Sequence, residues 1–226
     1  MNVLFEDNHI IAINKSCSDI VQGDKTGDTP LVEKVKLYLK EKYNKPGNVY
    51  CGVTHRLDRP VSGIVLFAKT SKALTRLNEM LREREIKKTY WAIVKNRPAN
   101  PEMLLEHYLT RNEKQNKSYA FDAPKGDAKK AILSLKEIAL ATTYTLLEVD
   151  LHTGRHHQIR CQLAHIGCAI KGDLKYGFPR SNKDGGIGLH ARQINFIHPV
   201  TKEAIEIIAP TPDDSLWKAF EGMVKK

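Results

Sequence analysis

Short runs of apolar, β-branched and aromatic residues recur along the chain between turn-forming residues. The runs at 4–5 and 10–13 flank a polar turn and predict two short strands. The run at 64–68 is apolar throughout, as in a strand buried on both faces. The same pattern predicts further strands at 89–94, 131–138, 143–149, 194–197 and 204–208.

Three other segments have the spacing of amphipathic helices. In the first, Thr29 is expected to cap the N-terminus, with Pro30 in the first turn. The second helix is expected to begin at Ser71. The last helix is expected to span 157–164 and to close at Gly167.

The order of these elements indicates the fold class. Strands outnumber helices, and the two do not alternate strictly. This order favours an α+β fold with a mixed, mostly antiparallel sheet flanked by helices over a doubly wound parallel sheet. The sequence contains neither an internal repeat nor a low-complexity linker, and the loops at 96–102 and 180–188 do not have the composition of a hinge. We therefore expect one domain over residues 1–226.

The composition is that of an ordinary globular protein. The chain has 226 residues, of which 41% are hydrophobic and 27% charged. Its apolar runs are far shorter than the roughly 18–20 residues of a membrane helix. Acidic residues at Glu6-Asp7 interrupt the N-terminus, which argues against a signal or transit peptide. These features exclude a membrane-spanning protein and indicate a cytoplasmic one.

The four cysteines contain no C-x-x-C pair, which argues against a zinc knuckle or a redox dithiol. They are Cys17, Cys51, Cys161 and Cys168. In a chain without an export signal, their simplest state is the reduced thiol.

The positive charge is concentrated in two stretches. The formal net charge is +10, yet residues 51–100 hold eleven basic against four acidic side chains and residues 151–200 hold seven against two. The other stretches are neutral within one charge. Clustered positive charge favours a surface that binds phosphates. The alternative is two unrelated clusters on different faces.

The first candidate for chemistry is the segment 54–63, which precedes the buried strand at 64–68. It holds one carboxylate, Asp58, between Arg56 and Arg59. Neighbouring guanidinium groups favour the ionised carboxylate, which can act as a nucleophile or a general base. The alternative is a surface ion pair made rigid by Pro60.

The second candidate is the segment 153–160, where basic residues stand at the start of a predicted helix. Helix N-termini with basic side chains bind anions readily. Four nearby histidines raise the question of a metal, but they lack the partner spacing of known zinc motifs, so we expect no metal. These histidines are His152, His156, His157 and His165.

The third candidate is the basic and aromatic segment 87–91. Strand alternation places Tyr90 and Trp91 on opposite faces. An aromatic ring beside cationic groups can stack on a nucleic-acid base, a contact worth about 1–3 kcal/mol. The alternative for Tyr90 is an ordinary core aromatic.

Taken together and in this order, the segments resemble the RluA family of pseudouridine synthases. The resemblance extends from the first strands to about residue 212. Its motifs are His55-Arg56-Leu57-Asp58 with Ser62-Gly63, Lys88-x-Tyr90-x-Ala92-x-Val94, Thr153-Gly154-Arg155-x-His157-Gln158-Ile159-Arg160, Gly172-Asp173-x-x-Tyr176-Gly177, and Leu189-His190-Ala191 before His198-Pro199.

The resemblance implies a pseudouridine synthase catalytic fold and an isomerase that acts on uridines in structured ribosomal or transfer RNA. By the same resemblance, Asp58 is the catalytic aspartate, and Tyr90 packs on the target base. Arg160 is the arginine paired with the aspartate, and Arg56 fills the space left by a flipped nucleotide. The resemblance implies no metal and no organic cofactor.

The chain departs from the family pattern in three places. Lys15-Ser16-Cys17-Ser18 stands where the family often has Lys-Pro-x-Gly. His156 replaces a usual threonine, and Cys161-Gln162 replace a usual Val-His pair, so these positions bear on substrate preference. The chain starts with strands of the catalytic domain, and we expect no N-terminal RNA-binding module. RNA affinity would then come from the catalytic domain itself.

Two alternative functions draw on the same residues. A non-catalytic RNA-binding protein on the same scaffold would use the same basic stretches. A metal-dependent nuclease would need a carboxylate cluster beside Asp58, and residues 51–100 offer only Glu79, Glu83 and Glu85. We expect a monomer, since no apolar interface stripe stands out. We also expect much of the excess charge to line one RNA-binding cleft with Asp58 at its floor.

Overall fold

A computed structural model describes residues 1–24 and 26–224 of the chain. It divides into two compact units. Unit 1 consists of Met1–Lys87 and Ala191–Pro210, and unit 2 of Lys88–His190 and Thr211–Lys226. The single domain expected from the sequence stays a prediction. In the described part of the chain, no helix has both the length and the apolar character needed to cross a membrane.

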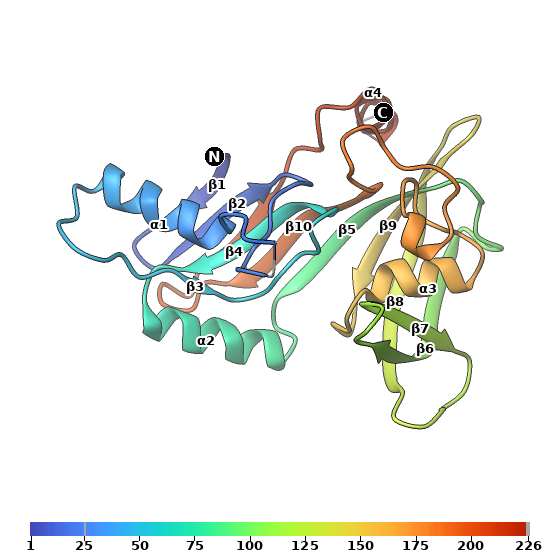
Figure 1. Cartoon of the computed structure of the whole chain (residues 1–226), viewed down its shortest axis with the longest axis horizontal. Helices are drawn as coiled ribbons and strands as arrows, with labels where there is room; N and C mark the ends of the chain where they lie inside the picture. The colour runs from blue at the N-terminus through green and yellow to red at the C-terminus, as the bar shows by residue number, and fades with distance from the viewer. Residues whose placement is uncertain (25, 225–226) are drawn as a thin grey trace. The chain divides into compact units, whose positions relative to one another are not determined.

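The sheet of unit 1 is built around the fully buried strand β4 (Ser62–Ala68) (Figure 1). Strand β2 (Ile10–Lys15) pairs antiparallel with β4 and also with β1 (Val3–Glu6). The short β3 (Gly52–Val53) joins β4 as well. Strand β10 (Leu189–Ile197) pairs antiparallel with β11 (Ala204–Ile208). These strands confirm the predictions at 4–5, 10–13, 64–68, 194–197 and 204–208.

Helix α1 (Leu31–Lys42) corrects the predicted cap at Thr29. The N-cap residue is Pro30, and no side chain caps the helix. Instead, the backbone N–H groups of Leu31 and Val32 donate to the carbonyls of Ile20 and Val21, at 2.7 and 3.2 Å. Because neighbouring backbone satisfies these groups, the helix does not need the hydroxyl of Thr29.

Helix α2 (Ser71–Arg82) begins at the predicted residue. Thr70 caps it, since its side chain accepts a hydrogen bond from the N–H of Ala73 at 3.1 Å. The buried face of α2 presents Leu77 to a core that also contains Leu66. This core supports β4 directly beyond the segment that carries Asp58.

Unit 2 holds a five-stranded antiparallel sheet in the order β5-β9-β8-β6-β7. The strands are β5 (Lys87–Val94), β6 (Glu102–Asn112), β7 (Lys117–Phe121), β8 (Lys129–Leu140) and β9 (Thr145–Leu151). Three of them confirm predictions, whereas β6 and β7 were not predicted. In β6 the buried residues alternate with exposed ones such as Leu104, so the apolar signal is interrupted.

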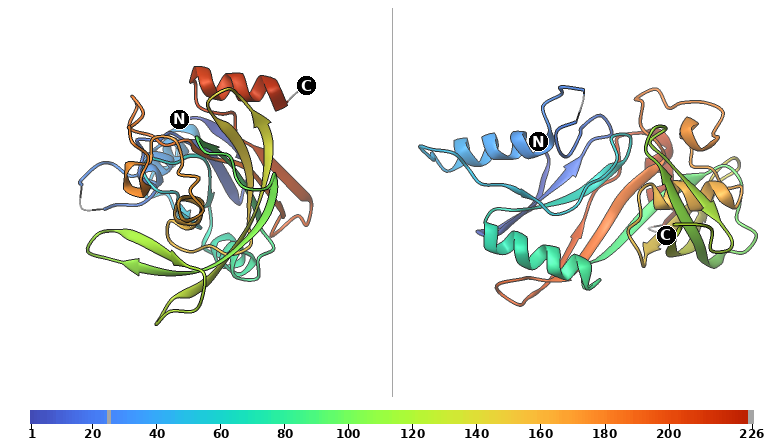
Figure 2. Two further views of the ribbon diagram at one scale, coloured as in Figure 1. Left: turned by 90° about the vertical axis from the view of Figure 1, so that its right-hand side faces the viewer. Right: turned by 60° about the horizontal axis from the view of Figure 1, so that its bottom comes forward.

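Helices cover both faces of this sheet. Helix α3 (Gln158–His165) agrees with the predicted 157–164 within one residue, and the left-handed Gly167 (φ 79°) follows it as expected. Figure 2 shows α3 end-on, with the strands of unit 2 curving around it. A short 3₁₀ helix, η1, spans Leu174–Tyr176.

Helix α4 (Ser215–Val224) was not predicted. It packs Trp217 and Phe220 against Trp91 and Leu146. The described strand pairs with a known register are all antiparallel, and four helices accompany them, which confirms the α+β class.

Candidate active site

The loop that carries Arg56 and Asp58 is fixed to the strand that follows it. The hydroxyl of Thr54 donates to the carbonyl of Leu66 at 2.6 Å, and the ring Nε2 of His55 accepts from the N–H of Leu66 at 3.2 Å. Leu57 is buried, Asp58 is partly exposed and Arg56 is exposed. The loop thus presents two of the predicted site residues from a backbone held against β4.

A tight turn directly follows the aspartate. The N–H of Val61 donates to the carbonyl of Asp58 at 3.0 Å, which closes a β-turn over Arg59-Pro60. Two residues beyond this turn, in β4, Gly63 has φ 111°, and a Cβ there would lie 2.3 Å from the carbonyl oxygen of Ala191. Only glycine fits this position, because both the conformation and the space exclude a side chain.

The buried amine of Lys15 holds the same turn from inside unit 1. Its Nζ donates to the carbonyls of Ser16, Arg59 and Val61 at 2.8, 3.1 and 2.7 Å, so each of its three N–H groups has an acceptor. Lys15 is 1% exposed, and this burial lowers the pKa of its amine to about 8. At neutral pH the amine is therefore still mostly charged.

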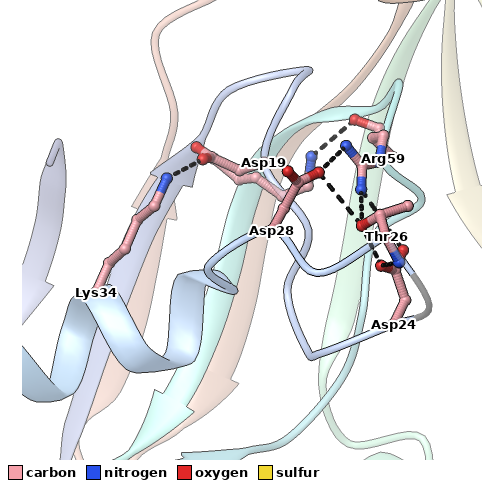
Figure 3. A network of polar contacts seen from close by, with 7 residues as sticks. Asp19, Asp24, Thr26, Asp28, Lys34 and Arg59 are labelled. Carbon is pink, nitrogen blue, oxygen red and sulfur yellow. Dashed lines mark hydrogen bonds and ion pairs between the residues drawn. The ribbon is translucent and has the colours of Figure 1, made fainter.

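Arg59, the residue after the aspartate, is held through its side chain too (Figure 3). Its guanidinium donates to Asp28 at 2.7 Å and to the hydroxyl of Thr26 at 2.8 Å, and lies 3.6 Å from Asp24. We call Asp24, Thr26 and Asp28 the acidic loop.

In unit 2, Arg160 is fixed by a buried carboxylate. Its Nε and Nη2 donate to the two oxygens of Asp173 at 2.7 and 2.9 Å. The two side chains are 6% and 1% exposed. The ring of Tyr176 lies 5.1 Å from the guanidinium carbon, a cation–π distance. A bidentate buried pair of this kind fixes the plane of the guanidinium.

His157 completes the surroundings of Arg160. Its Nε2 lies 3.2 Å from Nη1 of Arg160, and its Nδ1 lies 2.9 Å from the hydroxyl of Tyr176. Because a guanidinium can only donate, Nε2 must accept, and Nδ1 carries the ring proton and donates to Tyr176. His157 is left-handed (φ 52°), a strained conformation outside glycine.

Tyr90 lies on the same face of the unit 2 sheet as α3. Tyr90 pairs with Val149 of β9, and Val149 pairs with Leu135 of β8. Leu133 and Ala131 precede Leu135 in β8 by two and four positions. Since paired residues and alternate residues share a face, and Ala131 packs against Cys161 of α3, Tyr90 faces the side that carries Arg160. Trp91 faces the opposite side, under α4, as the alternation predicts.

The structure thus brings the predicted residues together in two pairs. Arg56 and Asp58 share one loop of unit 1, and Tyr90 and Arg160 lie on one face of unit 2. The pairing of Arg160 with Asp58 stays a prediction. Sequence reasoning missed the supporting roles of Lys15, His157, Asp173 and Tyr176. The last three lie within the motifs of the family resemblance, and these motifs could have identified them as candidate site residues.

The departures from the family pattern contact the sheet. Gln162 is fully buried, and its Nε2 donates to the carbonyls of Leu105 and Ala131 at 3.3 Å. The thiol of Cys161 donates to the carbonyl of Ser118 at 3.3 Å, and the ring of His156 contacts the hydroxyl of Ser118 at 2.9 Å. These residues fix α3 to β6, β7 and β8.

Among the described residues, one group has the composition of a metal site. His107, Asp122 and His165 bring one ligand atom each within 4.8 Å of one another. Nδ1 of His107 lies 3.0 Å from the donor nitrogen of Gln162, so it accepts, and Nε2 then carries the proton. A metal needs a bare ring nitrogen, which the protonated Nε2 of His107 does not offer. This Nε2 lies 3.7 Å from Asp122, and the hydrogen bond to that carboxylate comes from Nε2 of His165 at 2.8 Å.

The thiols show different exposure. Cys51, Cys161 and Cys168 are buried, and burial raises the pKa of the first two to about 12. Cys17 is partly exposed. No disulfide links the four thiols, all of which lie in the described part of the chain.

Comparisons with known proteins give one consistent result. Residues 9–165 match the family model for RNA pseudouridylate synthase. The chain is 34% identical to ribosomal large subunit pseudouridine synthase C of Buchnera aphidicola subsp. Baizongia pistaciae, over 92% of this chain and 66% of that protein. It is 27% identical to tRNA pseudouridine synthase C of Vibrio parahaemolyticus, over 96% of this chain and 92% of that protein.

The fold is also similar to a solved structure. Human RNA Pseudouridylate Synthase Domain Containing 4 matches with a TM-score of 0.81 at 20% identity, over 99% of this chain and 93% of the human one. This likeness supports the fold assignment. The chain spans about two thirds of the length of several curated relatives it matches, 66% in the Buchnera protein.

Proposed function

Because the chain belongs to the RNA pseudouridylate synthase family, a family of isomerases that act on RNA, we propose that it converts specific uridines of structured RNA to pseudouridine, with Asp58 as the catalytic residue. The observation that carries the proposal is the support given to Asp58. The turn behind it is fixed by the buried Lys15, and the loop before it is fixed to β4.

The reaction rearranges bonds within the substrate. The bond from the sugar to N1 of uracil breaks, the base turns, and the sugar carbon bonds to C5 instead. The proton lost from C5 is balanced by one gained at N1, so no oxidant or reductant is consumed. A fixed carboxylate can attack the sugar, add to the base or remove a proton from the sugar, and each route needs Asp58.

Base flipping brings the target uridine to this carboxylate. A base stacked in RNA is out of reach, and its extrusion costs a few kcal/mol. We propose that the exposed Arg56 fills the vacated space and that Tyr90 packs on the extruded base. The position of Tyr90 on the α3 face of unit 2 supports this role, since it shares that face with Arg160.

Arg160 is proposed to pair with Asp58 and to orient its carboxylate. The bidentate contact of Arg160 with Asp173 supports this role, because it fixes the plane in which the guanidinium offers its other N–H groups. His157 adds a second restraint at Nη1.

The test is the substitution Asp58→Asn, which keeps the shape of the side chain and removes its charge. We expect pseudouridine formation in RNA to fall by at least about 100-fold, the scale of a lost general acid–base group. Asp127→Asn, an exposed carboxylate of unit 2, is the matched control and should retain full activity. Full activity of Asp58→Asn would overturn the assignment. RNA binding without pseudouridine formation by the unaltered protein would favour the non-catalytic alternative.

The target RNA is proposed to be ribosomal or transfer RNA. The relatives are named for both classes, and the match to tRNA pseudouridine synthase C covers nearly all of that protein. Pseudouridine maps of total RNA from cells with and without this gene would identify the target. A map unchanged by loss of the gene would contradict the proposal. We propose the cytoplasm as the place of action and a monomer as the active form.

A further inference from the structure

The guanidinium of Arg59 is surrounded by oxygen atoms of the acidic loop. Asp28 accepts from Nη1 at 2.7 Å, the Thr26 hydroxyl accepts from Nη2 at 2.8 Å, and a carboxylate oxygen of Asp24 lies 3.6 Å away. The Thr26 hydroxyl donates in turn to Asp24. Two carboxylates and one hydroxyl therefore face the guanidinium of Arg59, the residue after Asp58 in the chain (Figure 3).

The turn at Asp58 does not depend on these side-chain contacts. The backbone carbonyl of Arg59 already accepts from Lys15, and the turn is closed by the hydrogen bond from Val61 to Asp58. Proline at the next position fixes its own φ angle. The side chain of Arg59 can change partners while the turn keeps its shape.

The contacts of Arg59 with the acidic loop are also exchangeable. The side chains of Arg59, Asp24 and Asp28 are 39%, 44% and 58% exposed. Ion pairs with this exposure contribute little and are screened by salt. A phosphate offers several oxygens to a guanidinium in a fork geometry, so it competes well with separate carboxylates.

We propose that Arg59 binds a backbone phosphate of the RNA substrate near the target nucleotide, and that the acidic loop occupies this phosphate position until RNA displaces it. The proposal rests on the proposed function, in which the loop of Asp58 receives RNA. Displacement is required because Asp24 and Asp28 would otherwise repel the incoming phosphate.

The acidic loop stays charged at neutral pH. A hydrogen bond from the Thr26 hydroxyl lowers the pKa of Asp24, and a hydrogen bond from Arg59 lowers the pKa of Asp28. The loop therefore remains a charged competitor for Arg59 throughout the neutral range.

The experiment measures RNA binding and turnover of the double variant Asp24→Asn/Asp28→Asn. The binding probe is a labelled, unmodified tRNA transcript, and turnover is followed on the RNA that the unaltered protein modifies. We expect the Kd and the KM to fall roughly three- to tenfold, with kcat unchanged, because two competing exposed ion pairs are removed. The melting temperature of each variant checks that the fold is kept.

Two controls distinguish a specific effect of the acidic loop on Arg59 from the general effect of removing negative charge. Glu33→Gln/Glu41→Gln removes two exposed carboxylates from α1 of the same unit and should change the Kd less. Arg59→Ala should weaken binding and reduce the dependence of log Kd on log salt by about one. In the Arg59→Ala background, the acidic-loop substitutions should no longer tighten binding beyond the α1 control.

Three outcomes would overturn the proposal. Equal gains from the acidic-loop and α1 variants would indicate a general charge effect. A loss of kcat in Asp24→Asn/Asp28→Asn would show that the loop positions Asp58. A gain that persists without Arg59 would exclude competition at this residue. Failure of the proposed function would look different, because the unaltered protein would then form no pseudouridine. The Kd values of the variants could still be measured and compared in that case.

Discussion

Three backbone carbonyls around the amine of Lys15 join the end of β2 to the turn behind Asp58. The sequence marked Lys15 only as the start of a segment that departs from its family. Its neighbours in the chain give no signal of burial, since the partners Arg59 and Val61 lie more than forty positions away. Only the folded chain places a cation beneath the candidate catalytic residue.

The substitution Lys15→Met is expected to reduce both stability and turnover. Methionine has a similar length but donates no hydrogen bond, and buried carbonyls left unsatisfied cost about 1–3 kcal/mol. We expect the free energy of unfolding, measured by denaturant titration, to fall by that amount. We also expect kcat to fall under conditions in which the variant is still fully folded. Lys34→Met, at an exposed ion pair with Asp19, is the control and should lose less than about 1 kcal/mol. Equal effects of the two substitutions would contradict the role of Lys15.

Asp173 gives a second prediction for a single residue. Asp173→Asn removes the charge opposite Arg160, and an uncompensated buried charge costs about 3–5 kcal/mol. We expect thermal and denaturant unfolding to show this loss, together with loss of pseudouridine formation. Adding Arg160→Met should restore much of the stability, since the charge is gone, but none of the activity. Recovery of activity in the double variant would exclude a positioning role for this pair.

For secondary-structure elements, the hydrophobic pattern was informative where burial is continuous. The apolar run of β4 and the first residue of α2 were predicted correctly. The pattern failed at β6, where exposed Leu104 stands among alternating polar residues, and at α4, whose partners Trp91 and Leu146 are distant in sequence. It also misplaced the cap of α1, because that cap is made by the backbone of Ile20 and Val21.

The contact between β1 and α1 makes stability sensitive to acid. Burial alone would raise the pKa of Glu6, but hydrogen bonds from Lys42, Lys69, Tyr43 and Tyr38 outweigh it and lower the pKa to about 2. This contribution is complete above the ordinary pKa of 4.5 and is lost as the pH falls from there towards 2. One pKa unit corresponds to about 1.4 kcal/mol, so the loss amounts to about 3 kcal/mol.

The measurement is the free energy of unfolding between pH 6 and about pH 2.5. Glu6→Gln should be less stable at pH 6 and should show a flatter decline in acid than the unaltered protein. Glu41→Gln, on the exposed face of α1, should leave the profile unchanged. Parallel profiles for all three proteins would exclude Glu6 as the source of the acid sensitivity.

At the scale of the whole molecule, the clustered charge leads to a prediction about RNA binding. The excess of basic residues lies in 51–100 and 151–200, the stretches that also contain Arg56, Asp58, Tyr90 and Arg160. A sequence assigns charge to stretches of chain but not to places in space, so the single basic cleft stays a prediction. The expectation of one domain also rests on composition and stays a prediction. Composition does not show how the strands divide between the two compact units.

A paired comparison tests the charge argument. Arg84→Gln/Lys87→Gln removes two exposed charges from the basic stretch, whereas Lys40→Gln/Lys45→Gln removes two from the neutral one. We expect the first variant to bind RNA more weakly and to reduce the dependence of log Kd on log salt by about one for each phosphate that the protein no longer binds. The second should have little effect. Equal weakening in both would indicate that the whole surface attracts RNA without a preferred region.

The unequal exposure of the four thiols has a practical consequence. Cys51, Cys161 and Cys168 are buried, whereas Cys17 is partly exposed and stands two positions after Lys15. A bulky thiol-reactive fluorophore would therefore attach at Cys17 in the native protein without any engineered site. The label would sit beside the segment that supports the turn of Asp58, and its emission would report in real time when RNA reaches that part of unit 1.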